Sequence, residues 1–174
     1  ASDVYKRQAL PLYKEAYQLA LEHKSIELQQ VSGIMLIKYL CGARYYSESL
    51  EYYNKIKPEI AFNSSMQNEV VKSYMELNKP DSARIYLAAR LLSERGDKIV
   101  LNCMMAETYI PEGQEDSAFV FLDRAMKSYK EKAKNYQKQG REAILPNCFL
   151  SPCYLFADLL WKKGKIQQAS QYYM

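Results

Sequence analysis

A chain of 174 residues has the length of one ordinary domain and can bury a hydrophobic core. Its 24 Lys and Arg outnumber its 20 Asp and Glu by only four, an excess too small to require a nucleic acid or a membrane as partner. Gly and Pro are few, six of each, and no stretch sustains the alternation that a fold built on strands would need. Apolar residues instead recur at three- and four-residue steps, so we expect an all-α protein.

Five helices are predicted in the first half of the chain. They cover residues 9–23, 26–41 and 46–57, a stretch that begins after Ser64 or Ser65 and runs to about residue 77, and residues 80–94. Ser25 has the side chain that an N-cap requires, and Gly42 is expected to end the helix that follows it. Pro58 is expected to close the third helix. Pro80 suits the first turn of the fifth, where no backbone N–H is needed.

The second half predicts four more helices, over residues 98–110, 115–139 and 151–163 and after Gly164. Asp97 is expected to cap the first of them, and residues 111–113 are expected to form the turn that follows it. The helix over 115–139 is unusually long for its neighbours. Residues 141–150 remain ambiguous, and Ser151, which precedes a proline, is expected to cap the next helix.

An internal repeat links these helices. Residues 81–87 and residues 116–122 both contain Asp-Ser-Ala-x-x-x-Leu, which places Ala83 and Ala118 35 residues apart. A tyrosine stands nine residues before each alanine, and a leucine stands nine residues before Ala169. A self-match at this period predicts stacked pairs of helices, with small residues where two helices cross closely. The positions expected to pack the repeats are Val71, Tyr74, Ala83, Leu87, Ala106, Tyr109, Ala118, Leu122, Ala157, Leu160 and Ala169.

This pattern resembles tetratricopeptide repeat (TPR) proteins over roughly residues 26–174, with Ser49 in a looser early copy. The resemblance implies a TPR-like antiparallel helix-pair solenoid, a right-handed superhelix of about three to four repeats. The expected units are residues 9–24 (partial), 25–60, 64–95, 97–140 and 141–174. The chain departs from the family in lacking its early Trp and its closing Pro, and Ala118 and Ala169 are 51 residues apart instead of about 34.

The two ends of the chain carry an expectation of their own. Residues 3–8, Asp-Val-Tyr-Lys-Arg-Gln, resemble a translation of the transposon end used to prepare sequencing libraries. We therefore expect residues 1–8 to be a non-native scar and residues 9–174 to be a single repeat domain. The sequence stops at Met174 inside an expected helix, so we expect truncation at both ends, and the compartment, cytoplasmic or periplasmic, stays open.

Residues that would carry catalysis or hold a metal are not grouped in this sequence. His23 is the single histidine, no Cys-x-x-Cys occurs, and no Gly-rich phosphate loop or nucleophile–base pair stands out. The sequence therefore predicts no enzymatic activity, no metal and no cofactor. The four cysteines are interpreted as small buried apolar residues, although a disulfide between Cys148 and Cys153 stays open as an alternative.

The TPR resemblance also implies a binding surface, because the first helix of each repeat lines the concave face of the array. The polar positions expected there, as contacts to an extended peptide, are Asn68, Lys72, Glu76, Glu107, Tyr154, Asp158 and Lys162. Most of the 16 tyrosines are interpreted as filling the space between helices, whereas some aromatics, such as Trp161 and Tyr173, could serve as binding anchors. The expected partner is a protein or a peptide.

The style of the repeats is similar to TPR regions of Bacteroidetes regulators, which implies a scaffold or sensor arm of a larger protein. Two alternatives stay open: a carbohydrate-binding outer-membrane lipoprotein with a helical-repeat frame, and the non-catalytic part of an enzyme. No direct contact with nucleic acid is expected, and a membrane is expected only through missing flanking segments. A basic run is interpreted as a solvated helix face, with an anionic partner as the alternative; it comprises Arg124, Lys127, Lys130, Lys132, Lys134, Lys138 and Arg141.

Overall fold

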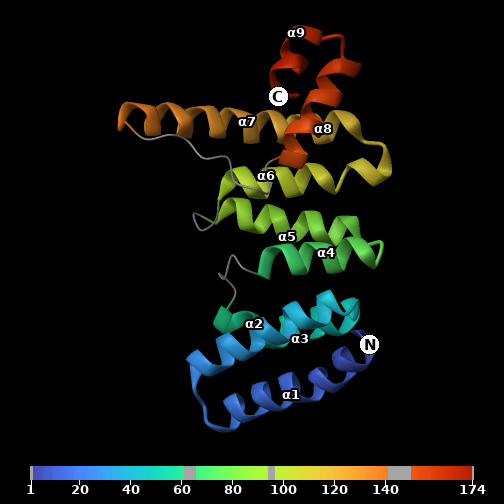
Figure 1. Cartoon of the computed structure of the whole chain (residues 1–174), viewed down its shortest axis with the longest axis vertical. Helices are drawn as coiled ribbons and strands as arrows, with labels where there is room; N and C mark the ends of the chain where they lie inside the picture. Colours follow the sequence, from blue (N-terminus) through green and yellow to red (C-terminus); the bar gives the residue numbers. More distant parts are fainter. Residues whose placement is uncertain (1, 61–65, 94–96, 141–149, 174) are drawn as a thin grey trace. The chain divides into compact units, whose positions relative to one another are not determined.

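A computed structural model describes residues 2–60, 66–93, 97–140 and 150–173, and the secondary structure in these ranges is entirely helical (Figure 1). The all-α prediction is therefore confirmed. The helices are α1 (Ser2–Glu22), α2 (Ile26–Gly42), α3 (Tyr46–Ile60), α4 (Gln67–Glu76), α5 (Pro80–Leu92), α6 (Lys98–Glu107), α7 (Glu115–Lys138), α8 (Leu150–Lys162) and α9 (Ile166–Ala169). Two short 3-10 helices, η2 (Ile110–Glu112) and η4 (Ser170–Tyr172), follow α6 and α9.

The chain separates into two compact units, unit 1 (Ala1–Ala83) and unit 2 (Arg84–Met174), and helix α5 passes from one into the other. Within unit 1, α2 packs against α1, α3 and α4. Within unit 2, α7 packs against α6 and α8, and α8 packs against α9 and η4. In each unit, helices that are neighbours in sequence are thus neighbours in space, as short connections favour.

Two predicted N-caps are confirmed. The Ser25 hydroxyl accepts a hydrogen bond from the backbone N–H of Leu28 at 3.3 Å, at the start of α2. The Asp97 carboxylate accepts one from the N–H of Ile99 at 2.9 Å, at the start of α6. Each cap satisfies one of the four N–H groups that the first helical turn leaves without an intrahelical acceptor.

Several predicted helix ends are wrong. Helix α1 begins at Ser2 because residues 2–8 contain no Gly or Pro that would stop it. Helix α3 continues through Pro58 to Ile60, since proline removes an N–H but keeps a φ that a helix accepts. Helix α6 ends at Glu107, before a 3-10 turn. Helix α8 begins at Leu150, which places Ser151 inside the first turn instead of before it. The capping residues proposed at 64 and 65, and residues 141–149, lie outside the described residues.

The core of unit 1 depends on a close approach of three helices. A Cβ atom on Gly33 of α2 would lie 2.7 Å from Ile56 Cδ1 of α3 and 3.4 Å from a ring carbon of Tyr17 of α1. Ser49, also buried, donates a hydrogen bond of 3.4 Å from its hydroxyl to the Ile37 carbonyl, which joins α3 to α2. Small residues at these two positions let large neighbours fill the space between the helices.

The core of unit 2 is built from α6, α7, α8 and α9. Ala106 and Ala118 are fully buried in one hydrophobic cluster with Ala169, and Phe156 packs in the same cluster.

The other positions assigned to repeat packing, in both units, are also interior. Two of them are half-buried, Tyr74 and Tyr109. The rest are buried: Val71, Ala83, Leu87, Leu122, Ala157 and Leu160. The residues that recur in the sequence are therefore interior residues, where close packing leaves little space for a larger side chain.

Candidate functional site

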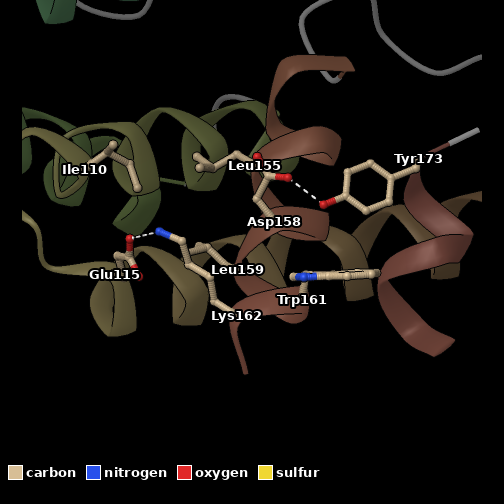
Figure 2. Close-up of a pocket in the computed structure, with 8 residues that line it drawn as sticks. All are labelled: Ile110, Glu115, Leu155, Asp158, Leu159, Trp161, Lys162 and Tyr173. Atoms are coloured by element: carbon tan, nitrogen blue, oxygen red, sulfur yellow. Dashed lines mark hydrogen bonds and ion pairs between the residues drawn. The ribbon is translucent and has the colours of Figure 1, made fainter. Parts of the chain in front are cut away.

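A pocket of about 290 Å³ opens on the surface of unit 2 (Figure 2). Helix α8 supplies most of its wall, and η2, the first turn of α7 and the residue after η4 complete it. Its lining is mixed in character, with three aliphatic, two aromatic and three charged side chains. They are Ile110, Glu115, Leu155, Asp158, Leu159, Trp161, Lys162 and Tyr173.

The helical repeat of α8 explains how one short helix lines this pocket. Most lining residues of α8 recur at steps of three and four residues, so they lie on one face of the helix. They are Leu155, Asp158, Leu159 and Lys162. Gly164 then adopts a φ of +72°, a left-handed conformation that glycine accepts without strain, and the chain turns back. This return carries Tyr173 to the pocket, where its hydroxyl points toward Asp158 (Figure 2).

The opposite face of α8 holds the pocket wall in place. Phe156 is buried there, with its ring 5.2 Å from the Phe119 ring and 5.3 Å from the Tyr172 ring, measured between centroids. Phe119 belongs to α7 and Tyr172 to η4, so one aromatic side chain joins three elements. Aromatic pairs at these separations stabilise beyond the area that they bury, and the pocket wall is accordingly a fixed part of the core.

Ion pairs close the side of the pocket next to α7. Lys162 of α8 pairs with Glu115, and Lys163 pairs with Asp116, in the first turn of α7. The hydrogen bond from Lys163 lowers the pKa of the Asp116 carboxyl. Two carboxylates in the first turn also complement the positive end of the helix dipole.

A hydrogen bond between Tyr173 and Asp158 closes the other side. The tyrosine hydroxyl donates to Asp158 Oδ1 at 2.5 Å (Figure 2). This bond to the carboxylate raises the pKa of Tyr173 above its ordinary value. Trp161 remains 55% exposed although it lines the pocket, and Tyr173 is 43% exposed. The pocket therefore presents aromatic surface to solvent beside a carboxylate.

Of the positions predicted to bind a peptide, two are brought together here, Asp158 and Lys162. Tyr154 is also on α8 and is 47% exposed, but it does not line the pocket. Glu107 lies at the end of α6, and although the residue keeps exposed surface, the protein around its carboxyl desolvates that group and raises its pKa. The remaining three predicted positions are exposed on α4 in unit 1: Asn68, Lys72 and Glu76.

Other lining residues were not predicted as contacts. Glu115 belongs to α7, which the TPR resemblance predicts to be the second helix of a repeat and so does not place on the concave face. Ile110, Leu155 and Leu159 look like ordinary core residues in the sequence. The two remaining lining residues, Trp161 and Tyr173, are among the aromatics that the sequence suggested as possible binding anchors.

The basic run on α7 is largely engaged inside unit 2. Lys127 pairs with Asp123 at 2.7 Å, and Lys132 pairs with Asp97 at 3.3 Å. The Arg124 guanidinium lies 5.2 Å from the Phe121 ring centroid, and Lys130 Nζ lies 5.4 Å from that of Tyr172. Lys134 and Lys138 are exposed, and Arg141 lies outside the described residues. Four of these cations thus contact groups of their own unit. This arrangement fits the interpretation of the basic run as a solvated helix face.

No disulfide joins the described cysteines Cys41, Cys103 and Cys153. Burial raises the pKa of Cys41 and of Cys153. Cys148 lies outside the described residues, so the predicted alternative of a Cys148–Cys153 disulfide stays untested. In the part of the chain that the structure describes, no group of His, Cys, Asp and Glu has an arrangement that could hold a metal ion. None of the helices described combines the length and the apolar character that a membrane crossing needs.

No protein-family model, curated protein or solved structure matches the chain.

Proposed function

We propose that this chain is a protein-interaction module of the TPR type that binds a peptide segment of a partner protein at the pocket on α8. The observation that carries the proposal is Trp161, which is 55% exposed while the opposite face of its helix is fixed in the core. An exposed tryptophan on a rigid element loses little entropy on binding, which is why tryptophan is enriched among the residues that dominate interface energies.

The TPR part of the proposal has its own support. Helix pairs follow one another along the chain, and α2 packs against α4 as well as against its direct neighbours. The recurring alanines Ala83, Ala118 and Ala169 are fully buried, which suits close helix crossings in successive repeats. In the proposed array the module would serve as a scaffold or as the sensor arm of a longer, membrane-anchored regulator.

A peptide array tests the binding proposal directly. The full 174-residue chain would be applied to immobilised 12-residue peptides of varied sequence, and binding would be quantified in solution by calorimetry. We expect Trp161→Ala to weaken binding at least tenfold, about 1.4 kcal/mol, because it removes the main apolar contact. Tyr154→Ala is the matched control, since Tyr154 is exposed on the same helix but does not line the pocket.

Equal binding by the wild type and Trp161→Ala would contradict the pocket as the site. Binding that depends on Tyr154 and not on Trp161 would place the contact surface elsewhere on α8.

A second function, glycan binding, is favoured by one specific observation. An exposed indole beside a carboxylate, as at Trp161 and Asp158, can stack on a sugar ring while the carboxylate accepts hydrogen bonds from hydroxyl groups. Titration of a mixture of neutral oligosaccharides, followed by the fluorescence of the single tryptophan, tests it. A saturable change with sugars and none with peptides would replace the peptide proposal with this one.

A further inference from the structure

We propose that the pocket on α8 selects a basic side chain, lysine or arginine, of the bound peptide. This inference rests on the proposed peptide-binding function and adds the chemical class of the residue that enters. It follows from three features of the pocket: its charge, its aromatic surface and its aliphatic wall.

The charge of the pocket favours a cation. Its lining holds two carboxylates, Glu115 and Asp158, and one cation, Lys162. Lys162 pairs with Glu115, so the charge of that carboxylate is compensated. Asp158 accepts a hydrogen bond from the neutral Tyr173 hydroxyl, and no Lys or Arg of the described residues forms an ion pair with it. One negative charge therefore faces the pocket without a cation, and an acidic ligand would be repelled by it.

The aromatic surface suits a cation as well. The faces of indole and phenol rings carry partial negative charge, and they attract ammonium and guanidinium groups within about 6 Å of the ring centroid. Trp161 and Tyr173 line the pocket and are both more than 40% exposed. Figure 2 shows the Trp161 ring extending from α8 toward the segment that carries Tyr173, with Asp158 beside them.

The same unit already contains a basic side chain bound in this way. The Arg84 guanidinium lies 4.6 Å from the centroid of the Tyr109 ring and pairs with the Glu112 carboxylate at 2.8 Å. Its N–H also donates to the Thr108 carbonyl at 3.2 Å. An aromatic ring, a carboxylate and a backbone carbonyl thus contact this arginine together. The pocket offers two of these three kinds of group, an aromatic ring from Trp161 and a carboxylate from Asp158, to an incoming side chain.

The aliphatic wall accounts for the rest of such a side chain. Ile110, Leu155 and Leu159 line the pocket and can cover the methylene groups of lysine or arginine. A volume of about 290 Å³ is at the small end for ligand pockets, which suits one side chain better than a folded ligand. The charged end would then meet Asp158 while the stem contacts the leucines.

Four matched peptides test this inference. They have the form acetyl-Gly-Gly-X-Gly-Gly-amide, with X lysine, arginine, norleucine or glutamate, and binding to the full chain is followed by the fluorescence of Trp161, its one tryptophan. We expect the lysine and arginine peptides to bind at least tenfold more tightly than the norleucine peptide, and the glutamate peptide to bind most weakly. Added salt should weaken the first two and leave the norleucine peptide almost unchanged.

Asp158→Asn is the decisive variant, because it keeps the shape of the side chain and removes its charge. We expect it to abolish the preference for lysine over norleucine while binding of the norleucine peptide persists. Glu131→Gln is the control, since Glu131 is exposed on α7 and does not line the pocket. Circular dichroism would verify that both variants fold.

The outcomes separate the two proposals. Equal binding of the lysine and norleucine peptides overturns the selection of a basic side chain but leaves peptide binding intact. An unchanged lysine preference in Asp158→Asn overturns the role of this carboxylate and hence the inference. No saturable change with any of the four peptides contradicts both the inference and the proposed function.

Discussion

The two units use the same kind of helix pairing but present different surfaces. Unit 1 carries ten Lys and Arg against ten Asp and Glu, whereas unit 2 carries fourteen against ten. The exposed apolar side chains of unit 1 are mostly aliphatic, such as Leu28, Val31 and Met35 on the outer face of α2. Those of unit 2 include Trp161 and Tyr173, next to charged groups. Similar residues recur at interior positions of the two units because packing constrains their size. Residues at outward positions differ because packing does not constrain them.

The largest expected effect comes from the recurring alanines, one in each unit. Ala83→Arg and Ala118→Arg each force a long charged side chain into a fully buried site, and we expect each to lower the free energy of unfolding by about 3 kcal/mol or more. Urea unfolding followed by circular dichroism measures both. Ala89→Arg, at an exposed position of α5, is the matched control and should be nearly neutral. Two neutral results at the buried positions would show that the repeat register is wrong.

A smaller effect is expected at Gly33 of unit 1, where α2 and α3 approach closely. Gly33→Ala places a methyl group 2.7 Å from Ile56 Cδ1, so we expect a loss of about 1 to 2 kcal/mol despite the better helix propensity of alanine. Adding Ile56→Val removes the clashing carbon and should restore part of the loss in a double-mutant cycle. Gly42→Ala is the control, because its Cβ would meet nothing within 4 Å. Equal effects at the two glycines would contradict the close approach of α2 and α3.

In unit 2 the cap of α6 offers a comparable test. Asp97→Ala removes the hydrogen bond to the Ile99 N–H and the ion pair with Lys132, and we expect a loss of about 1 kcal/mol. Lys132→Ala removes the exposed ion pair alone and should cost about 0.5 kcal/mol or less. Thermal melts of the two variants separate the contribution of the N-cap hydrogen bond to stability from that of the ion pair. A loss as large for Lys132→Ala as for Asp97→Ala would assign the effect to the ion pair instead of the cap.

The smallest expected effect concerns alkaline pH and the C-terminal segment of unit 2. The pKa of Tyr173 is raised by its hydrogen bond to Asp158, so this contact stabilises the folded state below the ordinary tyrosine pKa. The stabilisation is lost as the pH rises through the raised pKa, because the tyrosinate repels the carboxylate. Titration of ring-labelled tyrosine by NMR should show a raised midpoint for Tyr173, which Asp158→Asn returns toward the ordinary value, whereas the midpoint of Tyr39, raised by burial, should not respond to this substitution. Asp123→Asn should leave the midpoint of Tyr173 unchanged.

The helices and most of the interior could be predicted from the sequence. Apolar spacing located every helix to within a few residues at most boundaries, and Ser25 and Asp97 form the caps that their side chains suggested. The end of α3 could not be predicted from Pro58, because a proline lowers helix stability without forbidding it. Asp158 and Lys162 could be assigned to a binding surface from their place on α8, but Asn68, Lys72 and Glu76 do not join them in the pocket.

The sequence by itself determined the secondary structure and the buried face of each helix, because both depend on residues a few positions apart. It also placed small residues at the helix crossings, since only a small side chain permits a close approach. Only the tertiary structure decided that Tyr173 returns to Asp158 and that Glu115 pairs with Lys162. These partners lie 15 and 47 residues apart in the chain, and no local pattern fixes such a separation. The pocket exists because the turn at Gly164 and the packing of Phe156 bring them together.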